Sequence, residues 1–174
     1  EGGFFLFFAD WMVQIVNENT DFDGKVVVVQ PIEKGMCDVL SSQSCVYNHI
    51  CRGTEGVEVK RIDSISRCVK PYEDYDAYLA LAHNPDFRFI VSNTTEAGIT
   101  YVEGDKLTDR PAKSYPAKLT ALLYERFKAG LGGFIILPCE LIDQNGVKLR
   151  EIVLRYANEW ELGADFINWV EKEN

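Results

Sequence analysis

The sequence lacks any long apolar run, and this excludes a membrane-spanning helix. The apolar stretch at residues 4–9 ends at Asp10, whereas a helix that crosses a bilayer needs about 20 consecutive apolar residues. The opening also has neither the basic start nor the small-residue cleavage site of a signal peptide. We therefore expect no membrane partner.

The sequence is also poor in positive charge. It contains 18 Lys and Arg against 27 Asp and Glu, so its formal net charge is -9 and its isoelectric point is near 4.7. Nucleic-acid binding requires clustered Lys and Arg that displace the counterions of the phosphates. We therefore expect no nucleic-acid partner.

Histidine is scarce and paired cysteine motifs are missing. The histidines are His49 and His83, and the five cysteines include no C-x-x-C pair. Zinc sites need such ligands at close, regular spacing, and secreted disulfide frameworks usually contain an even number of cysteines. We therefore expect no metal, and reduced thiols in a cytoplasmic protein.

The 174 residues are 47% apolar, which is enough for one domain with its own core or for part of a larger enzyme. Strands are predicted at three continuous apolar runs, residues 25–29, 87–91 and 134–137. Such runs are typical of parallel strands that are covered on both faces. Residues 46–62 alternate around a Gly-Thr-Glu-Gly turn and predict an antiparallel hairpin.

Helical patterns separate these strands. Ser114 is a predicted N-cap, with Pro116 just inside the helix that follows it. Further helices are predicted at residues 72–82, 149–160 and 164–170. The order predicts an α/β fold: a mainly parallel sheet with helices on both faces and a small antiparallel hairpin insertion.

The first helix carries one narrow polar stripe, made by Asp10, Gln14, Asn17 and Glu18. Its other residues are apolar. We therefore expect this helix to be buried on most sides, as a helix packed against a sheet is.

Three strand ends are candidate ligand sites, because ligands of open parallel sheets bind outside the carboxyl ends of the strands. These ends are residues 30–33, 92–96 and 138–140. The small polar side chains at 92–95 suit contact with ribose or phosphate, but they can equally serve only to end a strand. At the third end, Glu140 is either an acid/base group or a hydrogen-bonded strand-end carboxylate, and Cys139 is expected to be an inert thiol.

The opening Gly2-Gly3 is a fourth candidate. A helix that begins directly after two glycines points its free N–H groups and its positive dipole end toward an anion. The full dinucleotide-binding fingerprint also needs a preceding strand and an earlier glycine, which are not in the sequence. The pair therefore predicts either a phosphate-binding loop or simply the start of a helix.

Several specific motifs carry a family resemblance. The sequence reads SNTTEAG at 92–98, SYPAKLT at 114–120 and PCELI at 138–142, in that order. With Asp10-Trp11 and the strand at 26–32, these stretches cover essentially the whole chain. The chain resembles the N-terminal part of the mannitol dehydrogenase family, in its uronate branch.

The resemblance implies an NAD-dependent oxidoreductase that interconverts D-altronate and D-tagaturonate in hexuronate catabolism, without a metal. Residues 1–174 would be the NAD-binding Rossmann-type domain, whose first strand precedes Glu1. The family's K-x4-N-x2-H catalytic pattern does not occur in the chain, so no catalytic residue is expected here and the catalytic partner is a helical C-terminal domain. Two alternatives are a sister enzyme (fructuronate reductase or mannitol dehydrogenase) and a dinucleotide-binding module that catalyses nothing.

Carried onto this chain, the family pattern predicts a set of cofactor-binding residues. Gly2 matches the second glycine of the family's G-x-G-x-F loop and Phe4 matches its aromatic position. Leu141 stands where the mannitol branch has a substrate-binding asparagine, which agrees with the uronate branch. The predicted cofactor-binding residues are Gly2, Gly3, Phe4, Gln30, Pro31, Glu33, Asn93, Thr94, Thr95, Cys139 and Glu140.

The chain departs from the family pattern at three places. Leu6 replaces an arginine at the helix start, and Ser44-Cys45 replace Asp-Gly at a turn. The strand at 25–29 is followed by Gln30 instead of the acidic residue that holds the adenosine ribose, and Glu33 is the nearest substitute. NAD is preferred over NADP because of the family resemblance.

Overall fold

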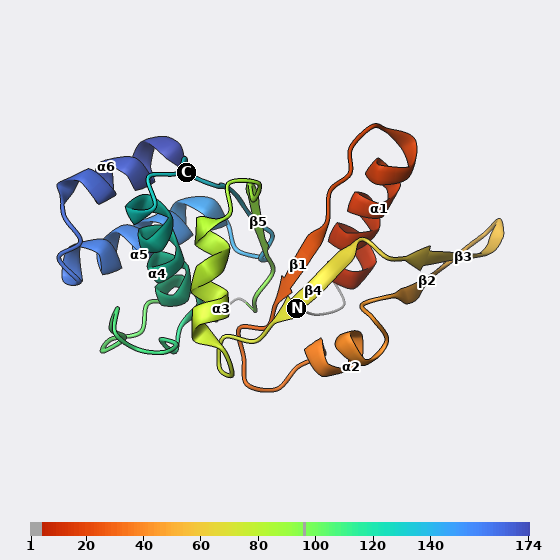
Figure 1. Ribbon diagram of the computed structural model, residues 1–174, viewed down its shortest axis with the longest axis horizontal. Helices are drawn as coiled ribbons and strands as arrows, with labels where there is room; N and C mark the ends of the chain where they lie inside the picture. Colours follow the sequence, from red (N-terminus) through yellow and green to blue (C-terminus); the bar gives the residue numbers. More distant parts are fainter. Residues whose placement is uncertain (1–4, 96) are drawn as a thin grey trace. The chain divides into compact units, whose positions relative to one another are not determined.

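A computed structural model describes residues 5–95 and 97–174 (Figure 1). The chain forms two compact units, Glu1–Glu73 and Asp74–Asn174. The predicted site residues Gly2, Gly3 and Phe4 lie outside the described residues.

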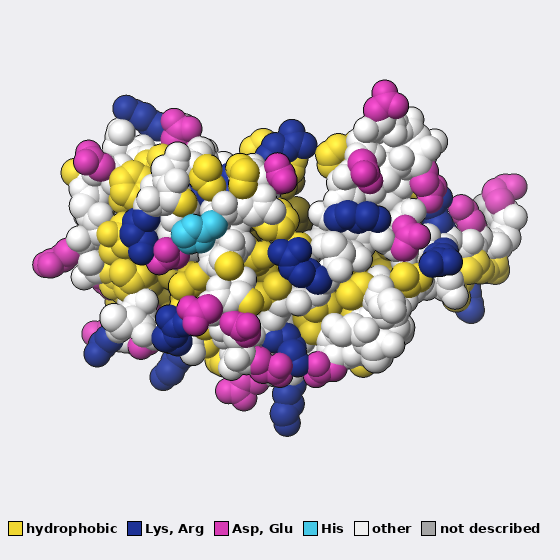
Figure 2. All heavy atoms as spheres, in the orientation of Figure 1, with side chains coloured by type: hydrophobic (Ala, Val, Ile, Leu, Met, Phe, Trp, Pro, Cys, Tyr) yellow, Lys and Arg dark blue, Asp and Glu magenta, His cyan; other side chains and the backbone are white. Residues whose placement is uncertain are grey.

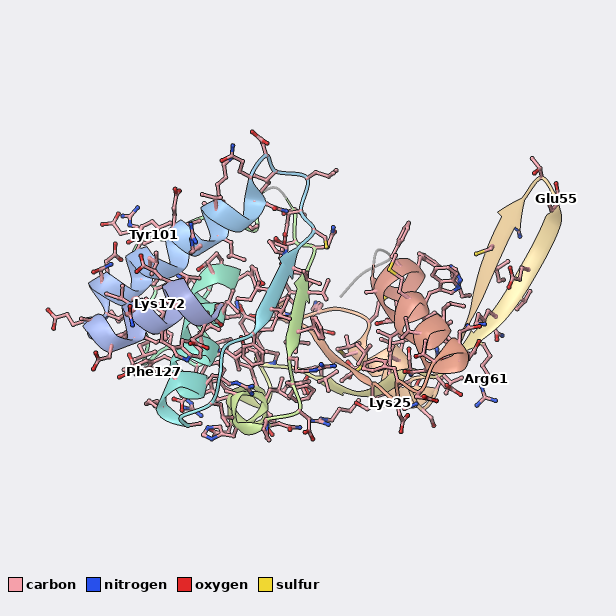
Figure 3. All side chains as sticks on the ribbon, turned by 90° about the horizontal axis from the view of Figure 1, so that it is seen from above. Lys25, Glu55, Arg61, Tyr101, Phe127 and Lys172 are labelled. Atoms are coloured by element: carbon pink, nitrogen blue, oxygen red, sulfur yellow. The ribbon has the colours of Figure 1, made fainter. Side chains whose placement is uncertain are left out.

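The first unit contains a parallel strand pair and a hairpin. A π-helical turn, η1 (Phe5–Ala9), leads into α1 (Asp10–Asn19), β1 (Val26–Val29) and α2 (Cys37–Ser42). Strands β2 (Tyr47–Gly53), β3 (Gly56–Ile62) and β4 (Ile65–Val69) complete the unit. β1 pairs in parallel with β4, whereas β2 and β3 form the predicted antiparallel hairpin. The turn of the hairpin, which carries Glu55, extends away from α1 (Figure 3).

Helix α1 differs from the sequence prediction. Asp10, on its polar stripe, is only 1% exposed, whereas the apolar Met12 is 52% exposed. The Asp10 backbone and the Gln14 side chain are both hydrogen-bonded to the segment between β3 and β4. Ser64 Oγ donates to the Asp10 carbonyl (2.9 Å), and the Asp63 N–H donates to Gln14 Oε1 (3.1 Å). Asp10 and Gln14 therefore face the rest of this unit while Met12 and Val16 are exposed, so the prediction that this helix is buried on most sides is wrong.

The second unit contains the other parallel pair and the larger helices. Helix α3 (Tyr75–Ala80) is capped by Asp74, whose Oδ1 accepts from the Ala77 N–H (2.8 Å), and continues into η2 (Leu81–His83). β5 (Phe89–Ser92), α4 (Tyr115–Lys128) and β6 (Ile135–Pro138) follow. Helices α5 (Asn145–Glu159) and α6 (Ala164–Glu173) end the chain. The predicted cap is confirmed, because Ser114 Oγ accepts from the Ala117 N–H (3.2 Å).

The core of the second unit lies between α4, α5 and α6 and one face of the β5–β6 pair. Ile90 and Ile136 pack against a cluster of buried side chains that includes Leu119, Leu123, Leu149, Val153, Phe166 and Val170. Alternate side chains of the same strands, Phe89, Val91, Ile135 and Leu137, are exposed. This alternation follows from the two-residue period of a strand.

Arg126 ties this core to the loops around it. Its guanidinium is buried and donates to the carbonyls of Ala82, Asn84, Phe87 and Gly132. It also lies over the Phe134 ring, 4.4 Å from the ring centroid. One cation therefore binds four backbone carbonyl groups of η2 and the loops that flank the core.

The surface carries both charge signs. Figure 2 shows Lys and Arg side chains interspersed with Asp and Glu and with apolar side chains on the face that is drawn. Within residues 5–95 and 97–174, no helix has the length and apolar character that a membrane crossing requires.

Candidate functional site at the strand ends

The parallel pairing of β5 with β6 brings two of the predicted segments together. Ser92 stands opposite Pro138 at the end of the pair, and the Cys139 N–H donates to the Ser92 carbonyl (2.7 Å). Asn93 then extends the contact, because its Nδ2 donates to the Cys139 carbonyl (2.7 Å). Residues 92–95 and 138–140 therefore form one continuous edge, which we call the strand-end cluster.

Glu140 fixes the backbone of this cluster. The residue is 5% exposed, and its Oε1 accepts from the Thr94 N–H (3.0 Å) and from Thr94 Oγ1 (3.1 Å). Asn145, the first residue of α5, donates from Nδ2 to the carbonyls of Pro138 (2.7 Å) and Glu140 (3.0 Å). This role of Asn145 was not predicted from the sequence, although an Asn-Gly pair just after a strand end signals a local side-chain to backbone bond.

The turn after Thr94 has room only for glycine at position 98. A Cβ atom there would lie 2.2 Å from Thr94 Oγ1 and 3.0 Å from the Thr95 carbonyl oxygen. The Gly98 N–H donates to that carbonyl at 2.6 Å, and the Thr95 side chain is exposed. The turn therefore brings its backbone close to the Thr94 side chain and leaves the small polar side chain of Thr95 exposed, which suits contact with a ribose or phosphate group.

Cys139 lies in the cluster but has little nucleophilic character. Burial raises the pKa of its thiol, and the negative charge of Glu140 raises it further. The thiolate, which is the reactive form, is therefore disfavoured. This direction is the one expected of an inert thiol, although Cys139 is half-buried, whereas the sequence predicted a buried thiol.

Three buried oxygen atoms at this edge have no hydrogen-bond partner among the described residues. They are Ser92 Oγ, Tyr115 Oη and Glu140 Oε2. Burial raises the pKa of Tyr115; the Ser92 hydroxyl is close enough to oppose this rise, and the Glu140 charge adds to it. Ser92 and Tyr115 lie close enough to interact with each other, whereas no described residue forms a hydrogen bond with Glu140 Oε2, and buried polar groups are nearly always satisfied. Tyr115 was not among the residues predicted from the sequence.

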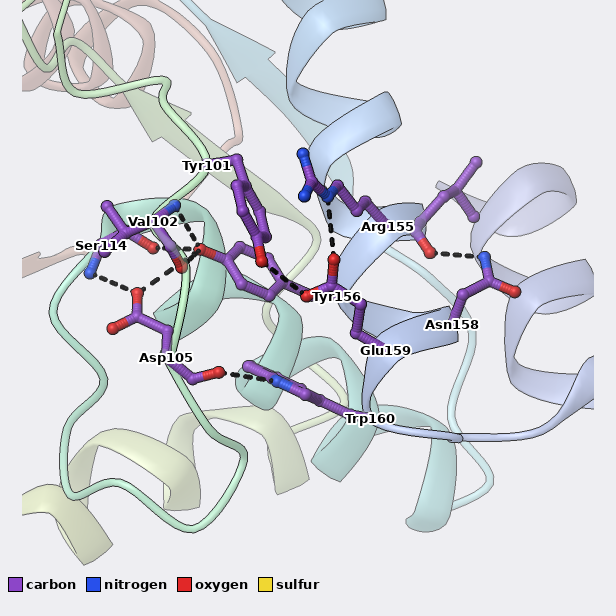
Figure 4. Close-up of polar contacts among 10 residues, drawn as sticks. Tyr101, Val102, Asp105, Ser114, Arg155, Tyr156, Asn158, Glu159 and Trp160 are labelled. Carbon is purple, nitrogen blue, oxygen red and sulfur yellow. Dashed lines mark hydrogen bonds and ion pairs between the residues drawn. The ribbon is translucent and has the colours of Figure 1, made fainter.

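A polar network supports the loop that connects the strand-end cluster to α4 (Figure 4). Tyr156 Oη donates to the Val102 carbonyl (3.0 Å), accepts from the Val102 N–H (2.9 Å) and lies 3.0 Å from Ser114 Oγ. The carboxylate of Asp105 accepts from the N–H groups of Ser114 and Lys113. Burial alone would raise the pKa of Asp105, but hydrogen bonds from Ser114 and Lys113 hold it below its usual value. The motif at 114–120 thus begins with a residue that orders this loop.

The end of β1 in the first unit has a different character. Gln30 is 2% exposed, and its Nε2 donates to the carbonyls of Ile32 (3.1 Å) and Glu33 (3.2 Å). Its Oε1 accepts from the Cys37 N–H (3.1 Å). Gln30 therefore uses its amide to close the loop between β1 and α2. Of the other predicted residues here, Pro31 is half-buried in this loop and the Glu33 side chain is exposed.

One departure from the family pattern, Leu6, has a structural explanation, whereas Ser44-Cys45 falls at a turn that suits Asp-Gly better. Leu6 packs against the buried cluster that contains Val28, Leu40 and Ile65, and its carbonyl accepts a hydrogen bond from the Tyr47 hydroxyl. A hydrophobic residue at position 6 is thus part of a core. Ser44 and Cys45 have φ values of 57° and 58°, the left-handed conformation that an Asp-Gly pair adopts more easily.

The strand-end cluster of the second unit fits a bound dinucleotide. It has a turn that excludes a Cβ atom, small polar side chains and unsatisfied buried oxygens at the carboxyl ends of two parallel strands. The end of β1 fits less well, because the Gln30 amide is engaged within its own loop. The only carboxylate predicted to contact the cofactor there is the exposed Glu33.

Comparisons with known proteins agree with this geometry. The chain is 51% identical over 183 residues to the altronate oxidoreductases of Escherichia coli O1:K1 and of Escherichia coli O9:H4 strain HS. These matches cover 100% of the chain and 38% of each relative, so the chain spans well under half the length of the relatives it matches.

Two solved structures have the same fold. The Pseudomonas fluorescens mannitol 2-dehydrogenase, in a ternary complex with NAD and D-mannitol, matches with a TM-score of 0.85 at 21% identity, over 99% of this chain and 38% of that one. A substrate-free D-sorbitol dehydrogenase matches with a TM-score of 0.80 at 21% identity, over 98% of this chain and 38% of that one. The predicted fold class, a Rossmann-type α/β fold with parallel strands and an antiparallel hairpin, is confirmed.

The mannitol dehydrogenase Rossmann domain family matches residues 2–174. This match covers the strand-end cluster and nearly the whole sequence. The chain belongs to the mannitol dehydrogenase family, as its Rossmann domain.

Proposed function

We propose that this chain is the NAD-binding part of an oxidoreductase that interconverts D-altronate and D-tagaturonate. The observation that carries the proposal is its 51% identity, over its whole length, to altronate oxidoreductases. The uronate or aldonate substrate is accordingly the proposed small-molecule partner. A cytoplasmic location is part of the same proposal, supported by the odd number and irregular spacing of the cysteines.

The residues proposed to hold NAD fall in three groups. Asn93, Thr94 and Thr95 would contact the cofactor at the end of β5, beside Cys139 and Glu140. Gln30, Pro31 and Glu33 belong to the adenosine side, with Glu33 as the ribose-binding carboxylate. Gly2, Gly3 and Phe4 would form the phosphate loop. When bound, NAD supplies the hydride acceptor and NADH the hydride donor.

The proton-transferring residues are proposed to lie in a helical C-terminal domain. The family's lysine, asparagine and histidine pattern does not occur among these 174 residues. The contribution of this chain would therefore be to bind and orient the cofactor, and the chain alone is expected to be inactive. Its 38% share of the altronate oxidoreductases supports this division.

A second candidate is a dinucleotide-binding module that binds weakly and catalyses nothing. One observation favours it. The family has an acidic residue at position 30 and an arginine at position 6, whereas here the Gln30 amide is hydrogen-bonded within its own loop and Leu6 packs in a core. Fructuronate reductase and mannitol dehydrogenase activities remain the alternatives within the family.

The test is a fluorescence titration with NADH, made on this chain and on the complete product of its gene, followed by addition of tagaturonate. We expect both proteins to bind NADH and only the complete product to oxidise it. The control is Gly2→Val, which should weaken NADH binding severely because a side chain would obstruct the backbone's approach to phosphate. Faster turnover of fructuronate or mannitol would reject the proposed substrate, and failure of both proteins to bind NADH would reject the cofactor.

A further inference from the structure

Glu140 places a buried negative charge at the strand-end cluster. Its side chain uses one oxygen to hold Thr94, and the other, Oε2, is buried without a hydrogen-bond partner among the described residues. No ion pair formed within residues 5–95 and 97–174 involves Glu140. The carboxylate is therefore available to interact with a positive charge that a ligand brings.

The charge acts on the groups around it. It contributes, after burial, to the raised pKa values of the Cys139 thiol and the Tyr115 phenol. Both effects have the same sign, since a nearby negative charge disfavours a second one. Poorly solvated surroundings of this kind also strengthen attraction to a cation, because the local dielectric constant is lower than that of water.

The position of Glu140 relates it to one half of a dinucleotide. A Rossmann sheet has two halves, and each half binds one of the two mononucleotides of the cofactor. The first half binds the adenosine part, and the end of its second strand holds the adenosine ribose. Strands β5 and β6 come after that half in the chain, so their carboxyl ends belong to the nicotinamide side. The nicotinamide ring carries a positive charge in NAD⁺ and none in NADH, whereas the rest of the cofactor is the same.

We propose that Glu140 is a specificity-determining residue, whose carboxylate makes the cofactor site favour NAD⁺ over NADH. The inference rests on the proposed function, because it takes NAD as the ligand. It goes beyond that function by assigning the choice between the two redox states to one side chain. At an effective dielectric constant of about 20, two unit charges separated by on the order of 10 Å interact strongly enough for a preference on the order of 10-fold.

The test compares dissociation constants for NAD⁺ and NADH in the complete protein and its variants, by calorimetry and by NADH fluorescence. Glu140→Gln keeps a side-chain oxygen that can accept from Thr94 but removes the charge. We expect it to weaken NAD⁺ binding about 10-fold relative to NADH binding. Equal weakening of both would show that Glu140 only positions Thr94, and would overturn the proposal.

Two further variants separate charge from geometry. Thr94→Val removes the Oγ1 hydrogen bond but leaves the charge, so it should change both dissociation constants by the same factor. Glu151→Gln removes one negative charge from an exposed position on α5 and should leave their ratio unchanged. A shift of the ratio in either variant as large as that of Glu140→Gln would contradict the assignment.

A third variant covers the case in which Glu140→Gln does not fold. Leu141 is 88% exposed, so Leu141→Lys should fold normally and place a positive charge next to Glu140. At low ionic strength it should shift the ratio in the same direction, by about 2-fold or more. An unchanged ratio in this variant would then overturn the proposal. If the wild-type protein binds neither nucleotide, the proposed function itself fails. That result differs from failure of the present proposal, in which both nucleotides bind but the variants leave the ratio of their dissociation constants unchanged.

Discussion

Thr94 and Glu140 lie 46 residues apart in the sequence and are joined through a single carboxylate oxygen. Glu140 Oε1 accepts from both the backbone N–H and the Oγ1 of Thr94, at 3.0 and 3.1 Å. A strand end that would otherwise be free loop is thereby tied to the neighbouring strand end. The strand-end cluster is consequently a built site, whose shape depends on a few side chains that can be changed one at a time.

Gly98 should be required for this shape. In Gly98→Ala the new Cβ would lie 2.2 Å from Thr94 Oγ1, so the turn has to move. We expect a loss of about 1–3 kcal/mol in the free energy of unfolding, together with weaker NADH binding, measured by urea denaturation and fluorescence titration. Gly132→Ala is the matched control, because a Cβ atom at position 132 has no neighbour within 4 Å. Equal stability of the two variants would contradict the close approach seen here.

Gln30 should be a determinant of stability. In Gln30→Glu a carboxylate would face the carbonyls of Ile32 and Glu33, which now accept hydrogen bonds from the amide. We expect the free energy of unfolding to fall by about 2–4 kcal/mol, measured by chemical denaturation at neutral pH. The exposed Glu33→Gln serves as the control and should change stability little. A Gln30→Glu variant as stable as the wild type would show that the loop does not depend on this amide.

Asp10 should make stability fall as pH rises. Burial raises the pKa of this carboxyl to about 7, above its unfolded value, so the folded state binds the proton more tightly. The resulting stabilisation is complete below about pH 4 and is lost as pH rises through 7, with a total change of about 4 kcal/mol at most. Asp10→Asn should therefore gain stability relative to the wild type between about pH 5 and 8.

The measurement for Asp10 is the free energy of unfolding at several pH values in that range. Asp21→Asn, at an exposed position before β1, is the control. A difference between Asp10→Asn and the wild type that does not vary with pH would mean that Asp10 is ionised in the folded protein at about pH 5.

Tyr156 should stabilise the loop behind the strand-end cluster. Tyr156→Phe removes a hydroxyl that bonds both backbone groups of Val102 and contacts Ser114. We expect a loss of about 1–3 kcal/mol, read from thermal and chemical unfolding. Tyr124→Phe removes a phenol hydroxyl from the same unit and should cost much less, since no hydrogen bond to it is formed within the described parts of the chain. Similar costs for the two variants would argue that the Tyr156 network contributes little.

The sequence predicted the elements with the strongest local signals. The valine run became β1, the alternating segment became the β2–β3 hairpin, and Ser114 caps α4. Strand β4 was missed because its sequence, Ile-Ser-Arg-Cys-Val, places polar residues at its centre. Helix α2 was missed because its six residues are too few to show a helical period and no side chain caps its N-terminus.

The candidate site was predicted in part, for physical reasons. Segments 92–95 and 138–140 were predicted to be strand ends of a parallel sheet, and the β5–β6 register brings them together. The burial of Gln14 and Gln30 was not predictable, since their partners include backbone N–H groups whose positions depend on the folded loops. Long-range contacts of this kind are not encoded in local periodicity.

The most direct test of the central claim, that the strand-end cluster is a cofactor-binding site, is hydrogen–deuterium exchange of the protein with and without NADH. We predict that NADH slows amide exchange in peptides that cover residues 92–98 and 137–141. NADH binding that leaves exchange in both peptides unchanged would contradict the claim and place the cofactor elsewhere.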